Sequence, residues 1–166
     1  MEDAKKAGKI RSIGVSNMSP KIWQEFVPNF STMPSVNQVE FNPFCQQKEL
    51  RKLMEPADVR IEAWAPLGQG NQALFENAVI NRLAKKYNCS VAQVILRFEE
   101  QDGAIILPKS IHTDRMRSNL EIFDFGLTDS EMDEMRSLDQ GHGLHDPDAQ
   151  GIKERLLSSF DVHAQN

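Results

Sequence analysis

The sequence is poor in the residues and runs that define several large classes of protein. It contains two cysteines, Cys45 and Cys89, which lie far apart and lack the spacing of metal ligands. We therefore expect free thiols in a reducing cytoplasm and no disulfide framework. No apolar run reaches about 18 residues, which argues against a membrane-spanning helix. The first residues, Met-Glu-Asp-Ala-Lys-Lys, lack the apolar stretch of a signal peptide.

The sequence also has no excess of positive charge, and it has only one tyrosine. The formal net charge is −5 and there is no basic arm, so nucleic acid is not an expected partner. Tyr87 is the single tyrosine, and the four histidines are scattered. We expect those histidines at the surface or in loops and not as metal ligands. With 166 residues, 40% of them hydrophobic, the chain can bury a core and should form one domain over residues 1–166.

The sequence does contain a repeated order of strand and helix. Strands are predicted over residues 11–17, 35–41, 60–65 and 104–107, each ending in polar residues. Helices are predicted between and after them, and this alternation indicates a parallel α/β sheet with right-handed crossovers. A (β/α)8 barrel keeps its site at the carboxyl ends of its strands but needs roughly 250 residues. The chain, with 166 residues and four predicted strands, is too short for such a barrel.

Capping signals place most of the helices. Residues 2–8 resemble the last turns of a helix that stops at a glycine, and Ser19-Pro20 predicts a capped helix start. Helices are also predicted over 46–55, 80–87, 91–101, 113–123, 128–138 and 152–160. Capping boxes begin those at 91 and 128, and Thr113 is the expected N-cap of the helix that carries Met116, Leu120 and Phe123.

The stretch from residue 104 to 125 is the most informative part of the chain. Four apolar residues at 104–107 predict a strand that is buried on both faces. The loop and helix start that follow hold Lys109, Ser110, Arg115 and Arg117. Free backbone N–H groups at a helix start, together with cations, suit a phosphate group. A solvated basic turn on a capped helix is the alternative from the residues alone.

Lys109-Ser110, with Arg115 and Asn119 behind them, resembles the adenosine-phosphate site of the aldo-keto reductases. The resemblance implies that Lys109 and Ser110 hold the 2′-phosphate of NADPH. It also implies that Arg115 packs on the adenine and reaches the same phosphate, while Asn119 contacts the adenine. The family usually has Glu before that Asn, whereas this chain has Ser118, which affects an adenine contact and leaves the phosphate contacts unchanged.

Two further segments resemble the part of the family's site that holds the nicotinamide carboxamide. Gly14-Val15-Ser16-Asn17 matches the family's Gly-Val-Ser-Asn, whose Ser and Asn bind the carboxamide. Asn37-Gln38 matches its Asn-Gln-(Ile/Val)-Glu, in which the Gln has the same role. Without the resemblance, Ser16-Asn17 is an ordinary turn and Gln38 is a core amide bonded to neighbouring backbone.

The segment Trp64-Ala65-Pro66-Leu67-Gly68 resembles a fourth family motif, (Tyr/Trp)-(Ser/Ala)-Pro-Leu-Gly. The resemblance implies that Trp64 stacks on the nicotinamide and that the loop containing Ala65 and Leu67 folds over the pyrophosphate. Taken alone, a Trp at a strand end is more often a packing residue.

The whole resemblance is to the second half of the family, and to bacterial-type NADPH-dependent aldehyde and ketone reductases such as the diketogluconate reductases. It implies the second half of a (β/α)8 TIM barrel, about four β/α units, with NADPH as cofactor. A small carbonyl substrate is implied only if an N-terminal half completes the barrel. The family's catalytic Asp, Tyr, Lys and His lie in that first half. Tyr87 is predicted on the back of a helix, so we assign no catalytic residue.

Three hypotheses follow for the function. The chain is the cofactor-binding half of an NADPH-dependent carbonyl reductase, or a nucleotide-binding half-barrel without chemistry, or an inert truncated fragment. In each case the strands at 11–17 and 104–107 would be unpaired edges, so self-association is expected. The inward faces that would lose cover are expected among Ile13, Val15, Val36, Val39, Ile61, Ala63, Ile105 and Leu107.

Overall fold

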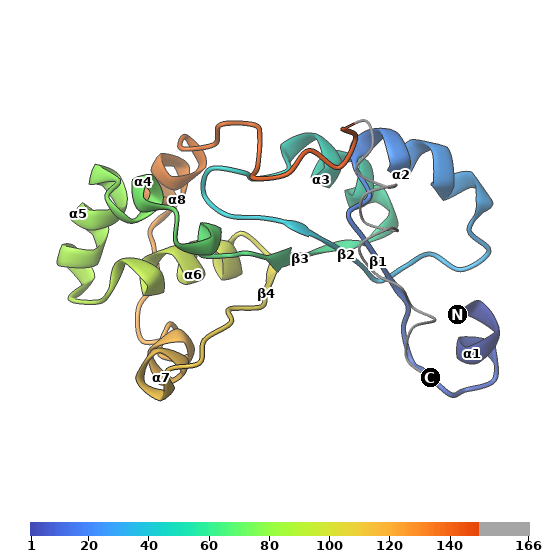
Figure 1. The fold of residues 1–166 in the computed structure, drawn as a ribbon, viewed down its shortest axis with the longest axis horizontal. Helices are drawn as coiled ribbons and strands as arrows, with labels where there is room; N and C mark the ends of the chain where they lie inside the picture. The colour runs from blue at the N-terminus through green and yellow to red at the C-terminus, as the bar shows by residue number, and fades with distance from the viewer. Residues whose placement is uncertain (150–166) are drawn as a thin grey trace, which may run out of the picture.

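The computed structural model describes residues 1–149, which form one four-stranded parallel sheet with helices attached (Figure 1). The strands are β1 (Gly14–Ser16), β2 (Val36–Glu40), β3 (Arg60–Trp64) and β4 (Ile105–Ile106), in the order β1-β2-β3-β4. All neighbouring pairs are parallel. This is the sheet of successive β/α units that the sequence predicts. The helix predicted over 152–160 lies outside the described residues.

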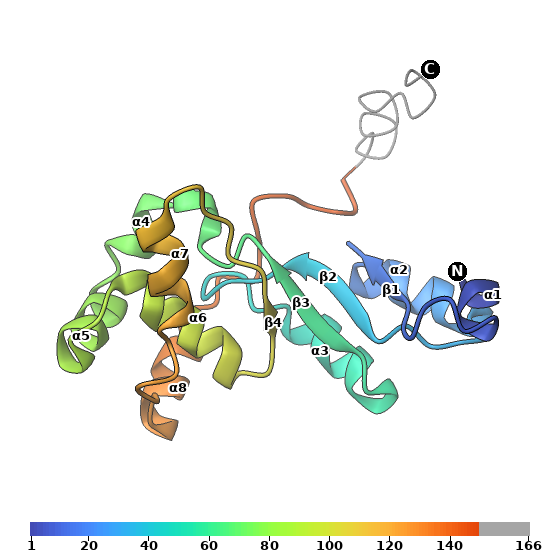
Figure 2. The same ribbon diagram turned by 90° about the horizontal axis from the view of Figure 1, so that it is seen from below.

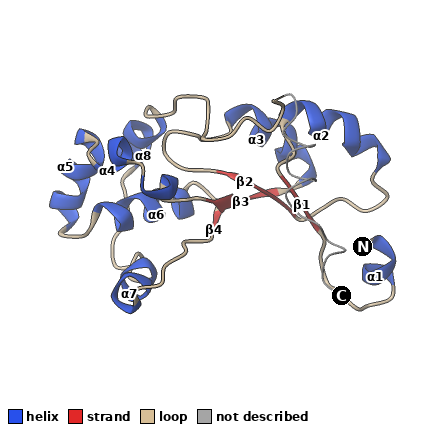
Figure 3. Ribbon diagram, in the orientation of Figure 1, coloured by secondary structure: helices blue, strands red, loops and turns tan. Residues whose placement is uncertain are grey.

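The helices form two groups, one from the first part of the chain and one from the second. Early in the chain are α1 (Glu2–Lys6), α2 (Pro20–Phe26) and α3 (Lys48–Met54). Later come α4 (Gln72–Phe75), α5 (Ala78–Tyr87), α6 (Val91–Gln101), α7 (Thr113–Leu120) and α8 (Asp129–Arg136). Three short 3-10 helices, at Val27–Asn29, Glu55–Ala57 and Gly68–Gly70, connect these elements. Figure 3 shows the strands between the two groups of helices.

Most capping predictions are confirmed. The Ser19 hydroxyl accepts from the Ile22 N–H at 3.2 Å, and Pro20 is the first residue of α2. Both capping boxes form, at Ser90 and Gln93 and at Thr128 and Glu131. The prediction for Thr113 is wrong, because His112 is the N-cap of α7 and makes no side-chain cap.

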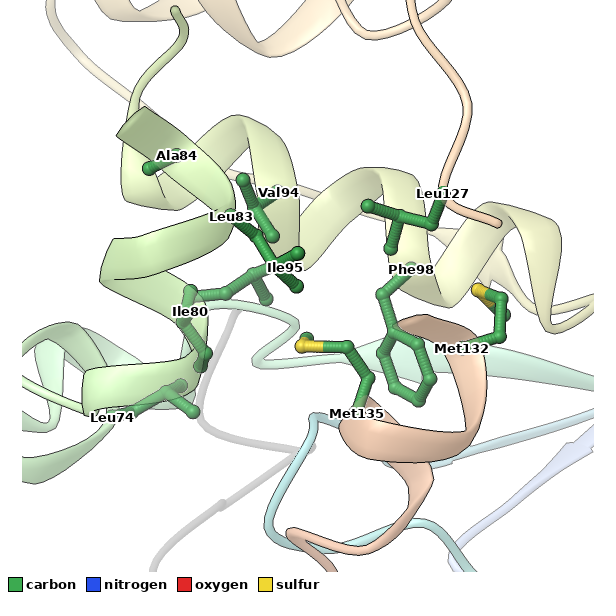
Figure 4. Packing of buried hydrophobic residues seen from close by; sticks show 10 residues of the cluster. All are labelled: Leu74, Ile80, Leu83, Ala84, Val94, Ile95, Phe98, Leu127, Met132 and Met135. Carbon is green, nitrogen blue, oxygen red and sulfur yellow. The ribbon is translucent and has the colours of Figure 1, made fainter. Parts of the chain in front are cut away.

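Two hydrophobic clusters form the core. The first joins α2 and α3 to the sheet, and Phe41 and Ala63 are fully buried in it. The second joins α4, α5, α6 and α8, and its central side chains are seen in Figure 4. Burying each large apolar side chain contributes about 1.5–3 kcal/mol. The clusters therefore hold the helices to the sheet and to one another.

The two faces of the sheet differ sharply in chemistry. Strand register puts Asn37 and Ile61 on one face and Gln38 and Glu62 on the other. The face toward α3 is apolar and buried, and Val39, Ile61 and Ala63 all belong to it. The expectation that these three would lose cover is wrong, because the chain's own helices cover them. In the view from below, β2 and β3 are open to view with α3 behind them (Figure 2).

The strand at β4 also differs from its prediction. Ala104 is buried, but Ile105 and Leu107 are 38% and 46% exposed, so the segment is not buried on both faces. β4 is an edge of the described sheet, and its open face has no covering layer. Burial of a barrel strand on both faces requires neighbours that the described chain does not supply.

Candidate functional site

The carboxyl ends of β1, β2 and β3 bring together several of the predicted site residues. Asn17 follows β1 with a φ of 54°, and its N–H donates to the Gln38 carbonyl at 2.9 Å. The Ser16 hydroxyl donates to the same carbonyl at 3.0 Å. The Trp64 indole Nε1–H donates to Asn17 Oδ1 at 2.8 Å. Ser16, Asn17, Gln38 and Trp64 therefore lie side by side at one edge of the sheet.

The left-handed backbone at Asn17 and Ala65 shapes this edge. Ala65 has a φ of 52°, and its carbonyl accepts from the Gly68 N–H at 2.8 Å. A left-handed conformation is uncommon for residues other than glycine and often marks a functional turn. These two residues end β1 and β3 with abrupt turns, so that the loop carrying Leu67 folds away from the strand. Leu67 itself is half-buried and packs on the core of α4, α5, α6 and α8.

The Gln38 side chain points to the open face of the sheet, where its amide donates to the Glu62 carboxylate. The alternative that Gln38 is a core amide bonded to backbone is therefore wrong. Sequence reasoning missed Glu62. The signal was available, because parallel pairing puts Gln38 beside Glu62, just as it puts Glu40 beside Trp64 two residues later on the same face.

The second group of predicted residues follows β4. Lys109 and Arg115 are exposed, and Ser110 accepts from the His112 N–H at 3.1 Å. Arg115 and Asn119 lie four residues apart on α7, and Asn119 is only 9% exposed. No hydrogen bond or ion pair joins this group to the first one within residues 1–149. Because β4 is parallel to β3 and next to it, both groups follow the carboxyl ends of neighbouring strands.

The side chains of the two groups differ in chemistry. Two amides, one hydroxyl and one aromatic ring lie on or just after β1 to β3, and two exposed cations lie beyond β4. Amides and hydroxyls suit a carboxamide, and cations suit a phosphate. The described residues contain no group of three or more His, Cys, Asp and Glu that would suit a metal ion. Nor is any helix among them long and apolar enough to cross a membrane.

The tyrosine, the two cysteines and three of the histidines are the other titratable groups that the sequence singles out. The Tyr87 hydroxyl donates to Glu131 at 2.6 Å between α5 and α8, and this bond, with burial, raises the pKa of Tyr87. Cys45 and Cys89 are free thiols, and burial, together with the Glu40 and Asp139 carboxylates, raises the pKa of Cys45 to about 12. His112, His142 and His145 are exposed, as the sequence predicts. His163 lies outside the described residues.

Comparisons with known proteins place the chain beside a large group of reductases. A model described as the Aldo/keto reductase family matches residues 1–140. The chain is 44% identical over 140 residues to a glyoxal reductase of Bacillus subtilis, covering 84% of this chain and 50% of the relative. It is 36% identical over 152 residues to the methylglyoxal reductase DkgA of Escherichia coli, covering 91% and 55%.

Solved structures give the same picture. A crystal structure of a Gox0644 mutant in complex with NADPH matches with a TM-score of 0.81 and 35% identity, covering 87% of this chain and 54% of that one. An aldo/keto reductase from Brucella melitensis matches with a TM-score of 0.76 and 38% identity, covering 82% and 52%. The chain spans about half the length of the relatives that it matches.

Proposed function

Because the chain belongs to the aldo/keto reductase family, we propose that it is the cofactor-binding half of an NADPH-dependent carbonyl reductase. The observation that carries the proposal is the grouping of Ser16, Asn17, Gln38 and Trp64 at the carboxyl ends of three adjacent strands. A structural neighbour, the Gox0644 mutant, is in complex with NADPH. The free thiols suit a reducing cytoplasm, where we propose that the chain acts.

Each residue has a defined part in this proposal. Ser16, Asn17 and Gln38 present hydroxyl and amide groups to the nicotinamide carboxamide, and the Trp64 ring gives the nicotinamide a stacking face. When bound, NADPH supplies the hydride. Ala65 and Leu67 belong to the loop over the pyrophosphate. Lys109, Ser110, Arg115 and Asn119 hold the adenosine 2′-phosphate and the adenine.

Tyr87, the single tyrosine of the sequence, does not lie at this end of the sheet. Reduction of a carbonyl needs a proton at the oxygen as well as a hydride at the carbon, and Tyr87 is bonded to Glu131 between α5 and α8. We therefore propose that reduction requires a first half-barrel, which would bring both the proton donor and the pocket for a small carbonyl substrate. A nucleotide-binding half-barrel without chemistry is the second candidate, favoured by the position of Tyr87.

A mutation at Arg115 tests the cofactor site. Charge-assisted hydrogen bonds contribute about 1.5–3 kcal/mol, and the 2′-phosphate is absent from NADH. Arg115→Ala should therefore weaken NADPH binding by roughly tenfold or more and leave NADH binding nearly unchanged. Fluorescence titration of the purified chain with each cofactor measures both affinities.

Arg60→Ala is the matched control, since Arg60 is also exposed and lies at the amino end of β3, opposite the candidate site. It should change neither affinity. An equal loss of NADPH and NADH binding in the Arg115 variant would contradict the assigned phosphate site.

A further inference from the structure

The segment after α8 crosses the candidate cofactor edge and is tied to it in three places. We call residues 141–148 the strap. Just before it, the Gln140 N–H donates to the Phe44 carbonyl at 2.8 Å. At its far end, Asp148 accepts from the Ser19 hydroxyl at 2.8 Å. Between these two ties the strap passes over Glu40, the last residue of β2.

Glu40 makes the central tie. Its carboxylate is buried, and it accepts from the Leu144 N–H at 2.8 and 2.9 Å and from the His145 N–H at 3.4 Å. A buried carboxylate is costly unless donors satisfy it, and here backbone N–H groups of the strap do so. Gly143 allows this approach, since a Cβ at that position would overlap the Glu40 carboxylate.

The same tie places His145 against Trp64. Glu40 and Trp64 are register partners on β2 and β3 and face the same side of the sheet. The imidazole ring of His145 lies 6.0 Å from the Trp64 ring, centroid to centroid, at an interplanar angle of 36°. The other end of the indole donates to Asn17. Trp64 is thus held at its nitrogen by Asn17 and beside its ring by a residue that Glu40 positions.

We infer that Glu40 is a positioning residue for the cofactor site, which seats the strap and, through His145, fixes the Trp64 ring. The cofactor part of this inference rests on the proposed function. His145 would form one wall of the site for the nicotinamide. Binding of the strap to Glu40 would therefore affect how the nicotinamide stacks on Trp64. Glu40 itself would touch no cofactor.

The fluorescence of Trp64 provides a direct test. The chain has two tryptophans, so a Trp23→Phe background leaves Trp64 as the only one. In that background, Glu40→Ala and His145→Ala should each shift the Trp64 emission, and the double variant should shift it no further, because both act through one contact. Additive shifts, or an unchanged emission in Glu40→Ala, would overturn the inference.

Glu40→Ala carries a risk of misfolding, and a strap variant avoids it. Gly143→Ala leaves the sheet intact but forces its Cβ against the Glu40 carboxylate. It should speed hydrogen exchange at the Leu144 and His145 amides by about tenfold or more, while the amides of β2 stay protected. His142→Ala, an exposed change in the same strap, is the control and should leave these rates unchanged. Equal exchange in Gly143→Ala and His142→Ala would also overturn the inference.

Titration with NADPH separates this inference from the proposed function. If both hold, Gly143→Ala weakens NADPH binding severalfold and His142→Ala does not. If no form of the chain binds NADPH while the exchange and emission results hold, the cofactor proposal fails and the role of Glu40 in seating the strap stands. If NADPH binds equally to Gly143→Ala and wild type, the strap does not position the site.

Discussion

Glu99 is a fully buried carboxyl group without a hydrogen-bond partner. It lies on α6, and neither of its side-chain oxygens has a partner in the described structure. Burial raises the pKa of Glu99 well above its ordinary value of 4.5, which favours the neutral acid in the folded state. An apolar residue would fill this position without that cost.

Replacing Glu99 with leucine should stabilise the fold. A buried polar group without a hydrogen bond costs about 1–3 kcal/mol, so Glu99→Leu should raise the free energy of unfolding by about that amount at neutral pH. Urea denaturation measures the change. Glu100→Leu is the control and should give no gain, because Glu100 is partly exposed and pairs with Arg97 at 2.7 Å.

The same carboxyl predicts a direction for pH dependence. Its folded-state pKa is raised, so the wild type keeps its full stability below about 4.5, the unfolded value, and loses stability as the pH rises toward the folded value. Glu99→Leu should lack this decline. Parallel stability–pH curves for the two proteins would contradict the assignment.

Glu131 should show the opposite dependence. Burial favours its neutral form, but hydrogen bonds from Lys86, Tyr87 and Thr128 outweigh burial and lower the pKa of Glu131 to about 2. Its contribution is therefore present above about 4.5 and is lost as the pH falls toward 2. Glu131→Gln should lower the free energy of unfolding by about 1.5–3 kcal/mol at pH 7, with the difference closing in acid. Glu134→Gln, at an exposed ion pair, should have little effect.

At the scale of elements, the segment from β4 to Phe123 carries large apolar side chains that the described chain leaves exposed. Six of the ten large hydrophobic side chains exposed within residues 1–149 lie between 105 and 123. Among them, Leu120 is 74% and Phe123 is 64% exposed. β4 and β1 are the two outer strands of the sheet, and each has one side without a pairing strand in the described chain. Exposed strand edges and large apolar patches mark sites of association.

We propose that these exposed side chains and strand edges drive self-association when no first half-barrel covers them. A Leu120→Gln, Phe123→Gln variant should therefore be shifted toward the mass of one 18.8-kDa chain in light scattering, relative to wild type. Phe26→Gln is the control, because Phe26 is 43% exposed on α2, away from β4. A wild-type chain that is a compact monomer at all concentrations would contradict this proposal.

The sequence predicts elements better than it predicts their surroundings. Local signals such as the Ser90 capping box and Pro20 at a helix start depend on neighbouring residues alone, and they are confirmed. Burial of Leu107 depends on what lies beside β4, and a local pattern cannot report that. The Glu40 tie joins residues more than a hundred positions apart, so no local spacing indicates it.

At the scale of the whole molecule, the chain belongs to the aldo/keto reductase family and spans about half the length of its relatives. A fold alone does not establish an activity, so the function depends on which side chains lie at the cofactor site. The proposal assigns cofactor binding to this chain and the proton donor to a complementary half.

The most direct test of this account measures NADPH oxidation with 4-nitrobenzaldehyde by the purified chain, alone and mixed with a separately purified first half of the Bacillus subtilis glyoxal reductase. General acid catalysis contributes about 10²–10⁴-fold, and the proposal assigns the group that supplies it to the complementary half. We predict no turnover above the uncatalysed rate for the chain alone, and measurable turnover for the mixture. Turnover by the chain alone at a rate typical of enzymes would contradict the account.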